Sequence, residues 1–161
     1  AARLDKICAF QVVEASDAQV LKAGTVYIAP GAANLEVEIG NPPGVARVRV
    51  RPPRQGASIV PSGDLLFKTA ADAFGPRFCA LVLTGMGSDG REGAELARRV
   101  GATVLAEDPR TAVMPGMPSS AIDAGVVDQV LALEELPVAI QRFADHCRSL
   151  ATSAGSGSSE R

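Results

Sequence analysis

The chain has 161 residues, of which 47% are hydrophobic and 21% charged, and its formal net charge is −2 at pH 7. This length suits one domain with a packed core and is too short for two. The chain has five Phe, one Tyr and no Trp. The slightly acidic balance and the few aromatic rings argue against nucleic-acid binding, which usually needs a basic surface or stacking rings.

The three cysteines, Cys8, Cys79 and Cys147, are odd in number and far apart, and the sequence has neither a signal-peptide pattern nor an apolar stretch of about 18 residues. These features predict a reduced, cytoplasmic protein without membrane insertion. The single histidine, His146, forms no recognised zinc motif with cysteines at such distances. We therefore expect no metal and no other cofactor.

The first third of the chain predicts short strands separated by turn residues, at 10–15, 24–30, 35–40 and 46–51. Their connections look like hairpins, which predicts an antiparallel region. The opening segment, residues 1–7, is typical of the end of a helix. The chain is therefore expected to begin partway through a domain.

From residue 60 onward, helices and strands alternate. A helix within 61–75 has Ser62 as its expected N-cap and ends at Gly75. The later elements are a strand in 77–84, a helix ending at Gly101, a strand in 102–108, a short serine-capped helix in 119–125, a strand in 126–133 and a final helix with Pro137 in its first turn. This order predicts an α/β fold with a mostly parallel sheet flanked by helices. Residues 1–152 form the predicted partial domain, and the Ser/Gly-rich residues 153–161 a flexible tail.

The loop "GMGSDG" (85–90) has the G-x-G-x-x-G spacing of a dinucleotide-binding turn, and Asp108 follows at about the distance of a ribose-binding acid. Asp89 argues against that hypothesis, because a carboxylate there would repel a pyrophosphate by ~4 kcal/mol for unit charges at 4 Å with an effective dielectric near 20. Asp108 precedes Pro109, so a turn also accounts for it.

Two other interpretations of Asp89 remain. At the carboxyl edge of a parallel sheet, it could orient a histidine that activates a serine. The neighbouring glycines, which have no side chains, would then let backbone N–H groups approach an oxyanion closely. It could also simply cap the helix that follows, with the glycines serving a tight turn. Spacing alone favours the cap.

Four segments resemble, in order and separation, the catalytic domain of chemotaxis protein-glutamate methylesterases (CheB-type): "GTVYIAPG", "PSGDLLF", "LVLTGMGSDGREGA" and "AVMPGMPSSAIDAGVVDQVLAL". The resemblance covers roughly residues 3–137. It implies an α/β domain that hydrolyses glutamyl methyl esters on the cytoplasmic helices of chemoreceptors, often with deamidation of receptor glutamines. It also implies regulation by a phosphoacceptor receiver domain in full-length members.

The resemblance assigns Asp89 to the Ser-His-Asp triad and the Met86 backbone N–H to the oxyanion hole. Gly116 and Met117 match a loop expected to line the substrate site. The nucleophile and base are expected upstream, since the chain has no G-x-S-x-G and His146 lies beyond the matched region. The chain alone is therefore expected to be inactive, and a non-catalytic partner-binding fragment is the alternative.

Two residues depart from the family pattern. Asn34 stands where histidine is expected, and Gly63 replaces a larger apolar residue, which should loosen the start of its helix. Ser62 lies near Asp64 and could be a nucleophile, but a helix N-cap is the favoured interpretation.

Overall fold

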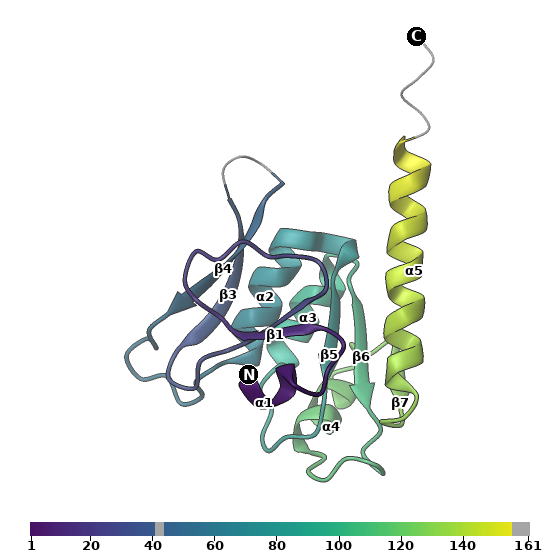
Figure 1. The fold of residues 1–161 in the computed structure, drawn as a ribbon. Helices are drawn as coiled ribbons and strands as arrows, with labels where there is room; N and C mark the ends of the chain where they lie inside the picture. The colour runs from purple at the N-terminus through teal and green to yellow at the C-terminus, as the bar shows by residue number, and fades with distance from the viewer. Residues whose placement is uncertain (41–43, 156–161) are drawn as a thin grey trace.

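The computed structural model describes residues 1–40 and 44–155 (Figure 1). The helices are α1 (Ala2–Asp5), α2 (Gly63–Phe74), the 3-10 turn η1 (Gly75–Arg77), α3 (Arg91–Arg99), α4 (Gly116–Asp123) and α5 (Leu136–Gly155). The strands are β1 (Gln11–Glu14), β2 (Thr25–Ile28), β3 (Asn34–Ile39), β4 (Ala46–Arg51), β5 (Cys79–Val82), β6 (Thr103–Glu107) and β7 (Gln129–Leu131). None of the helices in this part of the chain is long and apolar enough to cross a membrane.

The second half of the chain forms a parallel sheet in the order β5-β6-β7, with α3 and α4 as its connections. The predicted β-α-β alternation is therefore confirmed. The central strand β6 is the most buried, and Val104, Leu105 and Ala106 are at most 1% exposed. Such a continuous apolar run is what a strand covered on both faces requires.

The first third contains two separate strand pairs. β3 and β4 are antiparallel and pair along their whole length, from Asn34 opposite Arg51 to Ile39 opposite Ala46, which confirms the predicted antiparallel region. β1 and β2 are parallel instead. The expected hairpin-like connection is wrong for this pair, because residues 15–24 form a long link that returns the chain to the end from which β1 began.

The helix boundaries follow the sequence signals with two exceptions. Ser62 caps α2, since its Oγ accepts a hydrogen bond from the backbone N–H of Leu65 at 3.3 Å. The predicted serine cap of α4 is wrong, because the helix already begins at Gly116 and the Ser119 N–H is bonded to the Pro115 carbonyl at 2.9 Å. α5 continues to Gly155, past the expected start of the tail at 153, and residues 156–161 lie outside the described residues.

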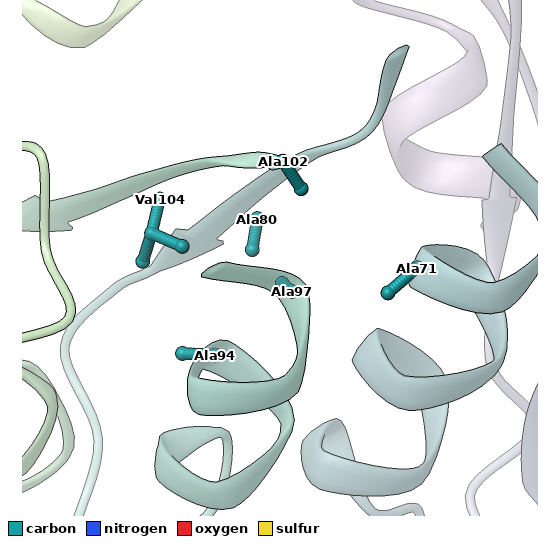
Figure 2. Close-up of a cluster of buried hydrophobic side chains, with 6 residues drawn as sticks. All are labelled: Ala71, Ala80, Ala94, Ala97, Ala102 and Val104. Atoms are coloured by element: carbon teal, nitrogen blue, oxygen red, sulfur yellow. The ribbon is translucent and has the colours of Figure 1, made fainter. Parts of the chain in front are cut away.

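The core between α2, α3 and the parallel sheet is made largely of alanine (Figure 2). Its buried members are Ala71, Ala80, Ala94, Ala97, Ala102 and Val104. Methyl side chains allow the two helices to lie close to the strands and to each other. At Gly93 the approach is so close that an added Cβ would lie 2.7 Å from both the Asp64 carbonyl oxygen and the Phe67 Cβ. This packing brings the amino-terminal turns of α2 and α3 together.

Candidate active site

Asp89 lies in the loop that leaves the carboxyl end of β5 and enters α3. Its half-buried side chain reaches across to the amino terminus of α2. Oδ2 accepts a hydrogen bond from the Gly63 N–H at 2.7 Å, and Oδ1 accepts from the Asp64 N–H at 3.1 Å and the Ser62 hydroxyl at 3.2 Å. The carboxylate therefore caps a helix, but the helix is α2 and not α3 as the spacing favoured.

The first turn of α3 receives its carboxylate from α2. Asp64 Oδ1 accepts a hydrogen bond from the Gly93 N–H at 2.7 Å, while Gly90 precedes α3 without a side-chain cap. Asp64 of α2 thus lies at the amino terminus of α3, and Asp89, just before α3, lies at the amino terminus of α2. The helix dipole stabilises negative charge at both places. Burial raises the pKa of Asp64, and the nearby Asp89 charge raises it further, whereas the hydrogen bond from Gly93 opposes the shift.

Ser62 connects Asp89 to the antiparallel region. Its backbone N–H donates to Oδ1 of Asn34 at 3.0 Å, and Asn34 is only 5% exposed. Gly63, expected to loosen α2, instead allows the carboxylate to approach the helix, since an added Cβ would lie 3.1 Å from Asp89 Oδ2. The two departures from the family pattern therefore lie on either side of Ser62: Asn34 accepts from the Ser62 N–H, and Gly63 donates to Asp89. Sequence reasoning did not predict these contacts. The N-cap signal at Ser62 was the one local clue.

Met86 lies in the same loop as Asp89, and its side chain is 77% exposed. The loop is fixed by backbone hydrogen bonds to Met114, just before α4, and to the first turn of α4 itself. The Gly85 N–H donates to the Met114 carbonyl at 2.8 Å, and the Met117 N–H donates to the Gly85 carbonyl at 2.9 Å. Gly116 and Met117, expected in a loop, are the first residues of α4, and the structure brings this first turn and the loop of Met86 together.

Close contacts explain the glycines at positions 85 and 116. A Cβ on Gly85 would lie 2.1 Å from Sδ of Met117, and one on Gly116 would lie 3.0 Å from the Gly87 nitrogen. Gly116 therefore allows α4 to begin against the backbone of this loop, and Gly85 leaves room for the Met117 side chain. This packing accounts for both glycines without a nucleotide. A buried acid, Glu107, supports the loop from below: its Oε2 accepts from the Thr84 N–H at 2.9 Å. The sequence signal for Glu107 was an acid at the end of an apolar strand.

A cavity of about 390 Å³ opens beside Asp89. Asn34 and Ser62 share its lining with the cationic side chains of Arg54 and Lys68. The residues that line it do not include Met86, Gly116 or Met117. The carboxylate and the expected oxyanion loop thus belong to one loop but do not share this cavity.

The other candidate residues have structural roles. Asp108, considered as a ribose ligand, accepts hydrogen bonds from the Arg110 backbone at 2.8 Å and from its guanidinium, and these lower the pKa of Asp108. The first turn of α3, where a pyrophosphate would bind, is already occupied by Asp64. His146 is exposed on α5. Within residues 1–40 and 44–155, no group of three or more His, Cys, Asp or Glu could hold a metal ion.

The fold and site define an α/β domain with an acid at the carboxyl end of its parallel sheet. The sequence model of the CheB methylesterase family matches residues 1–140. The chain therefore belongs to this family.

Individual relatives agree with this assignment. Protein-glutamate methylesterase/protein-glutamine glutaminase 6 of Anaeromyxobacter dehalogenans is 43% identical over 92% of this chain and 43% of its own length. The corresponding protein of a Nocardioides species is 44% identical over 93% of this chain and 41% of its own length. The chain thus spans about two fifths of the length of these curated relatives. The crystal structure of the Thermotoga maritima CheB methylesterase catalytic domain is 35% identical, with a TM-score of 0.82 over 90% of this chain and 74% of that one.

Proposed function

We propose that this chain supplies the acid and the oxyanion loop of a chemotaxis protein-glutamate methylesterase. The observation that carries the proposal is the position of Asp89. Its carboxylate lies at the carboxyl end of the parallel sheet, where active sites of open α/β folds form, and its orientation is fixed by another helix. Similarity to relatives named protein-glutamate methylesterase/protein-glutamine glutaminase supports the reaction class.

The proposed reaction is acyl transfer through a serine ester. The serine Oγ attacks the carbonyl carbon of the glutamyl methyl ester while a histidine takes the serine proton, and Asp89 stabilises the imidazolium that forms. The Met86 N–H donates to the developing oxyanion. Collapse of the tetrahedral intermediate breaks the bond to methoxide, which leaves as methanol with the histidine's proton. Water, deprotonated by the same histidine, then attacks the acyl-enzyme and releases glutamate and the free serine.

The same steps on a receptor glutamine would break the C–N bond and release ammonia, since the acyl-enzyme is identical. The word glutaminase in the names of the relatives supports this second substrate. Met117 and Gly116 lie in the first turn of α4, which is bonded to the loop of Met86, and are proposed to line the substrate site.

The serine and histidine are proposed to come from polypeptide that precedes this chain. Among the described strands, β5 has a partner on one side only. A further parallel strand fits along its free edge, and the carboxyl end of that strand would lie close to Asp89 because parallel strands end at the same edge of a sheet. This placement would put a nucleophile or base within reach of the carboxylate.

The proposed substrates are methylated glutamates on the cytoplasmic helices of chemoreceptors, so we place the enzyme in the cytoplasm. The free cysteines Cys8, Cys79 and Cys147 support a reducing compartment. A receiver domain is the proposed regulator in the full-length protein.

The test is methanol release from methylated receptor. The complete enzyme should hydrolyse the ester, and Asp89→Asn should lower kcat by at most about 10⁴-fold, as expected for loss of the triad carboxylate. Asp108→Asn is the matched control, because the Asp108 carboxylate is paired with Arg110 in the turn after β6, and this change should leave kcat unchanged. Unchanged turnover in Asp89→Asn would remove this residue from the mechanism. The isolated 161-residue chain should release no methanol.

A further inference from the structure

We propose that the first turn of α2 positions the Asp89 carboxylate for catalysis, with Ser62 and Gly63 as the positioning residues. This inference rests on the proposed function, since it takes Asp89 to be the acid of the triad. Asp89 precedes α3, yet its hydrogen-bond donors lie 25 to 27 positions earlier in the chain. The orientation of the carboxylate is therefore set by the packing of α2 and not by its own loop.

The three donors leave one specific place for a histidine. An ionised carboxylate offers about four acceptor positions, two on each oxygen. Oδ1 accepts from both the Asp64 N–H and the Ser62 hydroxyl, whereas Oδ2 accepts from the Gly63 N–H. The remaining position is on Oδ2, so the triad imidazole is expected to donate to that atom. Rotation of the carboxylate would break these bonds, which is why the free position keeps a fixed direction.

The donors are themselves held in place. The Ser62 hydroxyl accepts from the Leu65 N–H at 3.3 Å, so its single proton is free to point at Asp89. The Ser62 backbone is tied to the buried Asn34, and the opposite side of the junction is closed by the bond between Asp64 and the Gly93 N–H. β3, α2 and α3 thus converge on one carboxylate.

A substitution at Gly63 can remove the donor of the shortest hydrogen bond to Asp89 without removing a hydrogen bond of the helix. Gly63 is the first residue of α2, where proline is tolerated because the N–H has no partner within the helix. Ser62 has the extended conformation (φ −100°, ψ 124°) that a residue before proline prefers. Gly63→Pro should therefore fold while replacing the N–H that contacts Oδ2 with a ring carbon.

The experiment measures ester hydrolysis by the complete enzyme. Gly63→Pro should lower kcat by about 10- to 100-fold with little change in KM, because a misdirected carboxylate affects the transition state and not substrate binding. Gly63→Ala keeps the N–H, while its Cβ presses on Oδ2 at the 3.1 Å contact, so this variant separates loss of the donor from crowding of the carboxylate. Its kcat should lie between those of the wild type and Gly63→Pro.

Ser62 gives a second and independent pair. Ser62→Ala removes the hydroxyl donor and should lower kcat, whereas Ser62→Thr retains the hydroxyl and should restore it. This pair decides the question if Gly63→Pro does not fold. The inference is overturned if Gly63→Pro folds and turns over as fast as the wild type, or if Ser62→Ala and Ser62→Thr have equal kcat. If Asp89→Asn itself is fully active, the proposed function fails instead.

Discussion

The two halves of the molecule pack in different ways. Around α2, α3 and the parallel sheet, the buried core is made largely of alanine, and the helices approach until a Cβ at Gly93 would overlap its neighbours. In the antiparallel region, branched side chains such as Leu35 and Val48 form the core, and an apolar cavity of about 400 Å³ remains between β3, β4, α2 and β5. The close packing occurs where the amino terminus of α2 binds Asp89 and the amino terminus of α3 binds Asp64. Looser packing is tolerated where no such geometry is needed.

The largest expected effect tests the close approach of α2 and α3. Gly93→Leu should destabilise the fold by about 3 kcal/mol or more, because the side chain would overlap the Asp64 backbone and Phe67. Replacing a helical glycine would otherwise stabilise the fold by about 1 kcal/mol. The steric overlap therefore decides whether the substitution stabilises or destabilises the protein. Urea denaturation provides the measurement. Gly31→Ala, at a glycine with open space around it, is the control and should change stability by less than about 0.5 kcal/mol. Equal stability of the two variants would show that the helices are not closely packed.

A matched valine pair compares the two cores directly. Val104→Ala, in the alanine-rich core, should cost about 2–3 kcal/mol, because closely packed neighbours cannot collapse into the space. Val48→Ala should cost about 1–2 kcal/mol, since Val48 already lines the apolar cavity and its neighbours can relax. Both side chains are at most 1% exposed, so burial does not distinguish them. A larger loss at Val48 would contradict the proposed difference in packing.

The smallest effect concerns the pH dependence of the junction. The pKa of Asp64 is raised above its ordinary 3.8, so the native state binds a proton more readily than the unfolded chain. Its charge therefore destabilises the fold at neutral pH, and this penalty disappears as the pH falls through the raised pKa towards 3.8. Asp64→Asn keeps an oxygen acceptor for the Gly93 N–H. In urea denaturation, the stability of this variant relative to the wild type should be more favourable at pH 7 than at pH 4. An identical difference at both pH values would show that protonation of Asp64 does not affect stability.

The sequence predicted the elements better than it predicted their contacts. Ser62 and Gly75 mark the ends of α2 because caps are local signals, and the apolar run of β6 is visible because burial on both faces is a property of one segment. The parallel pairing of β1 and β2 was not predictable, since a long link has no turn signature. α4 started early because Pro115 and Gly116 begin the helix without a capping side chain.

The candidate site shows the same limit. Asp89 was identified from its place between two glycines at a strand end, but its partners were assigned to the wrong helix. A carboxylate beside the start of a helix predicts that it caps that helix. Nothing in the local sequence indicates that Asp89 instead caps α2 and that Asp64 instead caps α3. This arrangement depends on the close packing at Gly93, which involves residues about 29 positions apart in the chain. Glu107 was missed for a similar reason, since its contact with Thr84 crosses between strands.

The most direct test of the proposed role of Asp89 is a crystal structure of the full-length protein. We predict an imidazole nitrogen about 2.7–3.2 Å from Oδ2 of Asp89, with the bond between Oδ2 and the Gly63 N–H retained. A carboxylate that remains on α2 while every histidine lies beyond hydrogen-bonding distance would contradict the account, and Asp89 would then be only the cap of a neighbouring helix.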